Sequence, residues 1–98
     1  NNVFSWDTQK AVTNLAKHDV SFEEAVTVFR DPDALDWSDL THSDHEPRHK
    51  RLGASSDARV LLVVYTVRKL SHGKETIRII SARQASRKER KAYFGQPD

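Results

Sequence analysis

A chain of 98 residues is long enough for one domain, and residues 1–98 are expected to fold as a single unit. The composition excludes two classes: no apolar run approaches the ~20 residues that span a bilayer, and the absence of cysteine excludes disulfides and thiolate metal sites. The N-terminus lacks the basic-then-apolar pattern of a signal peptide, so a cytoplasmic protein is expected.

The net charge of +2 hides an asymmetry between the two halves of the chain. Residues 1–46 hold three Lys or Arg and ten Asp or Glu, whereas residues 47–98 hold thirteen Lys or Arg and four Asp or Glu. This distribution predicts a basic surface for an anionic partner. The alternative is that the two halves neutralise each other across one compact domain.

The first part of the chain predicts an extended segment and then a helix. Residues 3–6 are short and aromatic, and Asp7 is a suitable N-cap for a helix that runs to about His18. The apolar residues at helical spacing, which are expected to face the core, are Ala11, Val12, Leu15 and Ala16.

A second helix is predicted directly after the first. Ser21 and Glu24 have the spacing of a capping box, and Asp31-Pro32 should end the helix near Arg30. Its apolar face consists of Phe22, Ala25, Val26 and Phe29.

From residue 34 onward the pattern changes to that of strands. Residues 35–39 alternate as an edge strand would, and residues 48–54 read as extended. Residues 60–67 are apolar on both faces, which is typical of a central strand, and residues 75–83 alternate again. The pattern therefore predicts an α+β fold with a sheet of three or four antiparallel strands.

The last strand leads into a short basic helix. Ser86 and Glu89 form a capping box, and four cations follow within five residues, which indicates a surface that can hold a phosphate backbone. These cations are Arg87, Lys88, Arg90 and Lys91.

Cleavage of RNA needs no metal when the 2′-hydroxyl is the nucleophile, but it needs a base, an acid and cations around the phosphate. Candidate bases or acids are Glu46, His49, Lys17 and His18, with Tyr65 as a proton donor or stacking residue. Candidate phosphate ligands are Arg48, Arg51, Arg68, Arg78 and Arg83. Each also has a structural interpretation: Lys17 and His18 as partners of the helix dipole, Glu46 with Arg48 as a surface ion pair, and Tyr65 as a core residue.

Three histidines suggest a metal site at first sight. His42, His45 and His49 lie close to Asp44 and Glu46, but Pro47 prevents the helix on which this spacing would gather the ligands. We therefore expect neither a metal nor a cofactor.

An ordered set of residues from about 3 to 94 resembles the BrnT family of type II toxins. The motif Arg78-Ile-Ile-Ser-Ala-Arg83 makes the set specific. Its other members are Trp6, Asp7, Lys10, Ala11, Asn14, Lys17, His18, Ser21, Phe22, Glu23, Glu24, Ala25, Phe29, Asp31, Pro32, Asp39, His42, Ser43, Glu46, Arg48, Gly53, Ala85, Glu89, Arg90 and Tyr93.

The resemblance implies a RelE-like fold, with two N-terminal helices and a C-terminal helix on a small antiparallel sheet. It implies a metal-independent endoribonuclease that inhibits translation. The implied partner is a BrnA-type ribbon-helix-helix antitoxin, which forms a heterotetramer with the toxin and carries it to operator DNA. On this hypothesis Glu46 or His49 activates the 2′-hydroxyl, Arg48 and Arg83 stabilise the phosphate, and Tyr65 assists. The expected RNA-binding residues are Lys17, His18, Arg51, Arg68, Arg78, Arg87, Lys88, Arg90 and Lys91.

Two other functions remain open. The chain could be a degenerate toxin that binds nucleic acid or antitoxin without cleaving, or a DNA-binding module. The second is disfavoured because the predicted helix pair is acidic where a recognition helix should be basic.

The chain departs from the family pattern at the start of one predicted strand. Pro47 stands where the family has glutamate, and His49-Lys50-Arg51 replaces mainly apolar and small residues. A strand this polar is expected to be either an edge strand or an RNA-facing surface.

Overall fold

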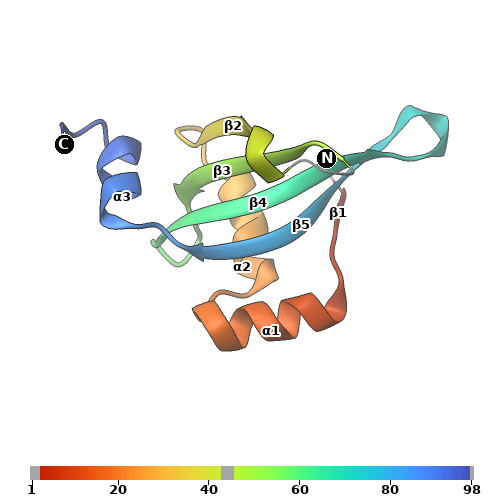
Figure 1. The fold of residues 1–98 in the computed structure, drawn as a ribbon, viewed down its shortest axis with the longest axis horizontal. Coiled ribbons are helices and arrows are strands. Elements are labelled where there is room, and N and C mark those ends of the chain that lie inside the picture. Colours follow the sequence, from red (N-terminus) through yellow and green to blue (C-terminus); the bar gives the residue numbers. More distant parts are fainter. Residues whose placement is uncertain (1–2, 43–45, 98) are drawn as a thin grey trace.

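The computed structural model describes residues 3–42 and 46–97 and shows a five-stranded mixed sheet with three α-helices (Figure 1). The strand order is β1-β5-β4-β3-β2, with β1 parallel to β5 and the other neighbours antiparallel. The strands are β1 (Val3–Ser5), β2 (Leu35–Asp39), β3 (Arg48–Ala54), β4 (Val60–Lys69) and β5 (Glu75–Gln84). The α-helices are α1 (Thr8–His18), α2 (Phe22–Thr27) and α3 (Arg87–Tyr93), and a 3-10 turn, Val28–Arg30, follows α2.

The α+β class is confirmed, but the predicted sheet of three or four antiparallel strands is wrong. The difference lies in β1, which pairs in parallel with β5 through Val3 and Thr76. Of the two alternatives for the polar strand β3, an edge strand is excluded, because β3 lies between β2 and β4. No helix in residues 3–42 and 46–97 is long and apolar enough to cross a membrane.

The predicted N-caps are all present. The Asp7 carboxylate accepts a hydrogen bond from the backbone N–H of Lys10 at 3.0 Å, and the Ser21 hydroxyl accepts one from that of Glu24, also at 3.0 Å. Ser86 and Glu89 form a complete capping box. The predicted box at Ser21 is incomplete, because the Glu24 carboxylate does not accept a hydrogen bond from the Ser21 backbone N–H. It accepts hydrogen bonds from Arg59 and from the Ser55 hydroxyl instead.

The main core lies between the sheet and α2, which covers the rear face of the sheet in Figure 1. We call this the helix-covered face and the opposite one the open face. Residues of the second helix region pack on alternate residues of β4 and on β5. The buried members are Val20, Phe22, Ala25, Val28, Leu61, Val63, Tyr65, Ile79 and Ala82.

Helix α1 buries only a small part of its predicted apolar face, in which Ala11 is half-buried against the main core. Val12 and Leu15 are 58% and 49% exposed, and the buried residue of α1 is Asn14. The Asn14 side-chain amide donates to the carbonyl of Ala82 at 2.8 Å, and its side-chain oxygen accepts from the N–H of Ala82 at 3.1 Å. Because β1 covers only Thr76–Arg78 of β5, Asn14 takes the place of a neighbouring strand farther along this edge. This polar docking explains why hydrophobic periodicity gave the wrong face.

A β-bulge in β5 decides which side chains reach the open face. Val64 pairs with Ser81, but the next residue, Tyr65, pairs with Ile79, so Ile80 is an extra residue. In a regular strand Arg78 and Ser81, three positions apart, would point to opposite faces. The bulge places both of them on the open face.

One end of the open face is closed by α3 (left in Figure 1). Leu52, Val60 and Leu62 form a second buried cluster there, against Tyr93 of α3. The Tyr93 hydroxyl donates to the Asp31 carboxylate at 2.6 Å, which raises the pKa of Tyr93 to about 12. The other end, toward the β4–β5 hairpin, carries polar and charged side chains.

Candidate functional site

The hairpin end of the open face gathers three arginines around one threonine. Arg48 of β3 lies opposite Thr66 of β4, and Thr66 lies opposite Arg78 of β5, so the three share one row across the sheet. Arg68 is two residues farther along β4 and points to the same face. The Glu46 carboxylate accepts hydrogen bonds from Arg68 at 3.0 and 3.3 Å. We call these five residues the hairpin-end cluster.

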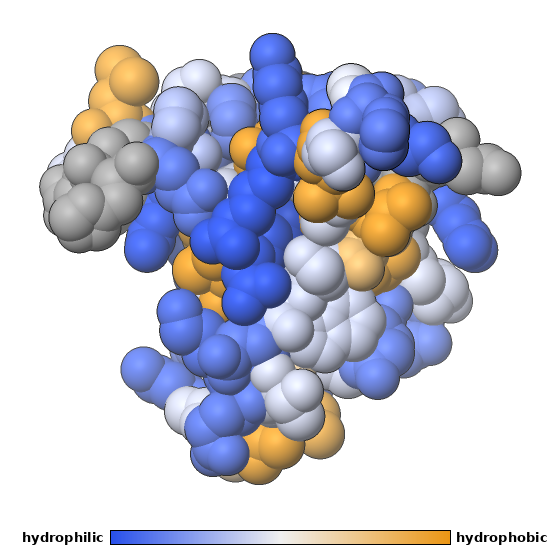
Figure 2. Space-filling view, turned by 90° about the vertical axis from the view of Figure 1, so that its right-hand side faces the viewer, coloured by the Kyte–Doolittle hydropathy of each residue, from blue (hydrophilic) through white to orange (hydrophobic). Residues whose placement is uncertain are grey.

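The electrostatics of the cluster keep Glu46 ionised. The hydrogen bond from Arg68 is the main cause that lowers its pKa, and the charges of Arg68, Arg78 and Arg48 act in the same direction. Partial burial opposes them only in part. The pair is accessible, since the Glu46 and Arg68 side chains are 35% and 49% exposed. Figure 2 views the molecule from the hairpin end and shows a largely hydrophilic surface.

Thr66 is the unusual member of the cluster. It is 1% exposed, and its hydroxyl has no hydrogen-bond partner among residues 3–42 and 46–97. Leaving such a group unpaired costs ~1–3 kcal/mol, so a buried hydroxyl normally has a partner, which can be a protein group, a water molecule or an ion. A hydroxyl between Arg48 and Arg78 is well placed to donate to an oxygen of a bound anion.

His49, Arg51 and Tyr65 lie on the helix-covered face, away from this cluster. Tyr65 is 7% exposed, and its hydroxyl donates to the Asp36 carboxylate at 2.6 Å. Its ring stacks on His49 at 5.3 Å, and burial, followed by Asp36, raises the pKa of Tyr65. Arg51 lies over the Phe29 ring and donates to Asp36 at 3.3 Å. The structure thus separates these three residues from Glu46 and Arg48.

Arg83 lies at the other end of the open face, beside α3. It pairs with Glu89 through two hydrogen bonds of 2.8 and 2.9 Å. Arg83 is opposite Leu62 and Arg78 is opposite Thr66, so the two arginines are four β4 residues, or ~13 Å, apart along the sheet. The bond from Arg83 is the main cause that lowers the pKa of Glu89 to about 2. The predicted set of catalytic residues is therefore split between two ends and two faces.

The cations of α3 form a separate basic surface on the outside of that helix. Arg87, Arg90 and Lys91 line a shallow hollow with Phe94, and the Arg90 guanidinium lies 5.6 Å from the centre of the Phe94 ring. Lys88 is exposed on the same helix. Their predicted contact with RNA stays a prediction.

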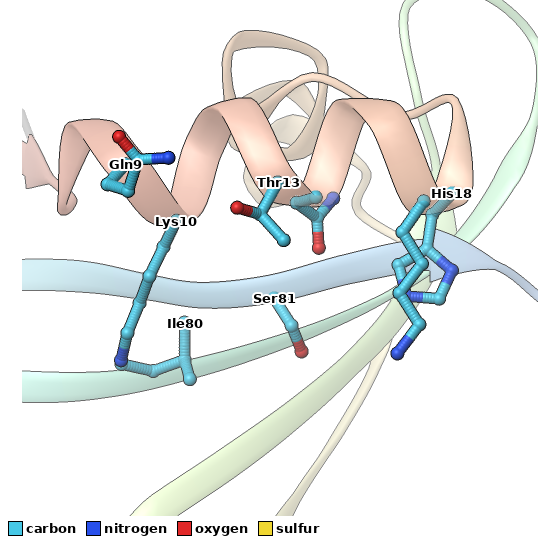
Figure 3. A pocket seen from close by; sticks show the side chains of 8 residues that line it. Gln9, Lys10, Thr13, His18, Ile80 and Ser81 are labelled. Carbon is cyan, nitrogen blue, oxygen red and sulfur yellow. The ribbon is translucent and has the colours of Figure 1, made fainter.

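Lys17 and His18 line a groove of about 270 Å³ between α1 and the edge of β5. Figure 3 shows Lys10 at one end of this groove, His18 at the other and Ser81 between them. Lys10 and Ser81 were not among the candidate site residues. The available signal was the helical spacing of Lys10, Asn14, Lys17 and His18 along one face of α1.

The histidine cluster considered as a metal site falls largely on residues that are not described. Asp44 and His45 lie outside the described residues, whereas His49 stacks on Tyr65. Among residues 3–42 and 46–97, no group of three His, Asp or Glu side chains is arranged to hold a metal ion.

The comparisons with known proteins agree with this fold. A sequence model described as "Ribonuclease toxin, BrnT, of type II toxin-antitoxin system" matches residues 6–89. The crystal structure of the Brucella abortus ribonuclease toxin BrnT is similar, with a TM-score of 0.63 and 20% identity over 89% of this chain and 100% of that one. A search of the curated proteins finds no match. Because the family match covers most of the described residues, the chain belongs to the BrnT family of ribonuclease toxins of type II toxin–antitoxin systems.

Proposed function

We propose that this toxin is a metal-independent endoribonuclease and that the hairpin-end cluster holds the phosphate at which RNA is cut. The observation that carries the proposal is the unpaired, buried hydroxyl of Thr66 between Arg48 and Arg78, with the ionised Glu46 nearby. In the transfer of the phosphoryl group to the 2′-oxygen, the carboxylate can act as the base for the 2′-hydroxyl and the three cations can stabilise the charge on the phosphate. The Thr66 hydroxyl can donate to a phosphate oxygen.

In the proposed reaction, Glu46 accepts the proton of the 2′-hydroxyl as the 2′-oxygen bonds to phosphorus. The bond from phosphorus to the 5′-oxygen breaks, and that oxygen takes a proton from solvent. The products are a 2′,3′-cyclic phosphate and a 5′-hydroxyl. Arg48 and Arg78 bind the non-bridging oxygens, on which negative charge grows.

The lowered pKa of Glu46 determines how much of the rate acceleration the base can supply and how much the arginines must supply. A carboxylate with a low pKa is always ready to accept a proton at neutral pH but is a weak base. The arginines must therefore supply most of the acceleration by stabilising the transition-state charge, an effect of ~10²–10³-fold for one such donor. Arg68 holds the Glu46 carboxylate through two hydrogen bonds and so fixes its position.

The expected cellular effect and the expected antitoxin partner are inferred from the family. We infer that cleavage of RNA inhibits translation in the bacterial cytoplasm and that an antitoxin neutralises the toxin. A BrnA-type ribbon-helix-helix antitoxin, a heterotetramer and operator binding through the antitoxin remain the expected arrangement, as does the relation of the fold to RelE-like toxins. A neighbouring gene for a ribbon-helix-helix protein would support this partner.

The test is incubation of the purified protein with RNA, with and without EDTA, beside the Glu46→Gln variant. We expect equal cleavage in both wild-type reactions, cyclic phosphate ends, and almost none by the variant. Cleavage lost only with EDTA would overturn the metal-independent mechanism. Intact RNA in every reaction would favour a toxin that binds without cutting.

A further inference from the structure

We propose that the groove between α1 and β5 is a second RNA subsite. It holds a phosphate of the same RNA strand, next to the phosphate at which that strand is cut. The proposal rests on the function proposed above and extends it to a different part of the molecule. The groove has about 270 Å³ and is lined from α1 by Lys10, Lys17 and His18 and from β5 by Ser81. This volume is slightly below the usual range for small-molecule pockets and suits one nucleotide unit.

The chemistry of the lining selects an anion with hydroxyl groups. Eight side chains line the groove, and they include two lysines and a histidine but no carboxylate. Thr13 and Ser81 add hydroxyls that can bond to a sugar or a phosphate, and Ile80 adds an apolar surface beside the Lys10 side chain (Figure 3). Lysine amines bind phosphate as flexible point charges, which suits a strand of variable sequence.

The helix dipole explains only part of this charge. Lys17 and His18 are in the last turn of α1, where the dipole favours cations. Lys10 is in the first turn, where the dipole disfavours a cation and where α1 has no acidic residue after its cap. Lys10 nevertheless extends along the groove toward β5 (Figure 3). A ligand accounts for its position, whereas helix stability does not.

The groove borders the open face, on which the hairpin-end cluster also lies. Its helix is fixed to β5 by the paired hydrogen bonds between Asn14 and Ala82. Through the bulge, Ser81 shares the open face with Arg78. Ser81 is opposite Val64 and Arg78 is opposite Thr66, so the two are two β4 residues, or ~7 Å, apart along the sheet. One extended RNA strand can therefore contact both the groove and the hairpin-end cluster.

The test measures RNA binding without cleavage. In the full-length Glu46→Gln protein, Lys10→Ala and Lys17→Ala are combined, and the affinity for a short fluorescent single-stranded RNA is followed as salt is raised. Each lost phosphate contact on a single strand reduces the steepness of the plot of log affinity against log salt by ~0.7. We therefore expect the slope of the double variant to be less steep by up to ~1.4. Replacing both lysines by arginine should preserve the slope.

The matched control is Lys69→Ala with Lys74→Ala, which removes the same charge from the exposed β4–β5 hairpin. We expect a smaller change of slope there than in the groove variant. Equal changes in the two double variants would show a general charge effect and would overturn the subsite. An unchanged slope in a folded Lys10→Ala/Lys17→Ala protein would overturn it as well.

A cleavage assay separates failure of the subsite from failure of the proposed reaction. In the wild-type background, the groove variant should raise KM for the RNA at least fivefold while kcat changes less than threefold, since the groove lies outside the hairpin-end cluster. Loss of kcat with unchanged KM would overturn its role as a binding site. If Glu46→Gln cleaved normally, the proposed reaction would fail, but the salt slope would still decide whether the groove binds RNA.

Discussion

The two ends of the open face use the same pair of residue types, an arginine and a glutamate, in different ways. At the α3 end, Arg83 and Glu89 are joined by two hydrogen bonds, and Glu89 also accepts from the backbone N–H of Ser86. At the hairpin end, Glu46 binds Arg68, while the charges of Arg48 and Arg78 also act on it.

The two ends differ in how their charges and hydrogen-bond donors are partnered. At the α3 end Glu89 also belongs to the capping box with Ser86, and Arg83 is opposite Leu62 of the buried apolar cluster, which is the arrangement of a structural support. At the hairpin end the charges of Arg68, Arg78 and Arg48 act on Glu46, and the Thr66 hydroxyl beside them has no partner among the described residues. A buried hydroxyl donor beside several arginines is the reason that we propose an anion-binding site at this end.

The largest expected effect is that of Glu46→Gln. Loss of a general base typically lowers kcat by ~10²–10⁴-fold, and the amide keeps the size of the side chain. Single-turnover cleavage of a labelled RNA measures it, with circular dichroism to confirm the fold. A variant with wild-type kcat would show that Glu46 is not the general base, and His49 would be the first alternative.

The pH profile distinguishes these two bases. The folded pKa of Glu46 lies below its ordinary value, so the base is deprotonated throughout the neutral range, and the rate should fall only as pH drops below ~4.3. A fall of the rate within the neutral range would exclude Glu46 as the base. Arg68→Ala removes the main cause of the shift and should move the acidic limb upward. A profile that Arg68→Ala leaves in place would argue against Glu46.

Arg78→Ala should lower kcat by ~10²–10³-fold, since it removes a cation that faces the growing charge on the phosphate. Arg78→Lys keeps the charge but loses the two-pronged geometry, so an intermediate rate is expected. Exposed Lys74 on the hairpin offers a control, and Lys74→Ala should leave kcat within about threefold, as expected of a cation outside the cluster. Equal losses in Arg78→Ala and Lys74→Ala would mean that only net charge matters.

Thr66→Val tests the unpaired hydroxyl. The free energy of unfolding should stay the same or rise, because the hydroxyl has no hydrogen bond to lose and valine keeps the shape. Cleavage should fall about tenfold, the effect of one hydrogen bond of ~1.4 kcal/mol to a charged group. Thermal unfolding and kcat on the same preparation give both quantities. Unchanged cleavage would show that Thr66 does not touch the substrate.

Much of the fold could be predicted because its signals are local. The caps at Asp7, Ser21 and Ser86 and the apolar run of β4 lie within a few residues of what they specify. The parallel pairing of β1 with β5 and the docking of Asn14 on Ala82 depend on residues about 70 positions apart. Hydrophobic periodicity carries no information about such polar contacts.

The candidate site was less predictable because it depends on register. The residue types were identified, but Arg48, Thr66 and Arg78 meet only through the pairing of three strands. A bulge of one residue at Ile80 then decides what shares a face with Arg78. Arg83 belongs to the same strand and yet pairs with α3, and nothing in the spacing of the motif reveals this.

The smallest effect on cleavage is expected for Arg83→Ala, which breaks the pair at the α3 end. Arg83 and Glu89 are 42% and 24% exposed, so solvent weakens the pair and the loss of unfolding free energy should be only ~1 kcal/mol. Because the folded pKa of Glu89 is lowered to about 2, the pair's contribution is present above its ordinary value of ~4.3 and is lost as pH falls toward 2. The difference in stability between wild type and Arg83→Ala should therefore shrink across that window, as followed by urea unfolding. We expect kcat to stay within about threefold. A folded Arg83→Ala protein without activity would support the phosphate role predicted for Arg83 and would mean that both ends of the open face serve the reaction.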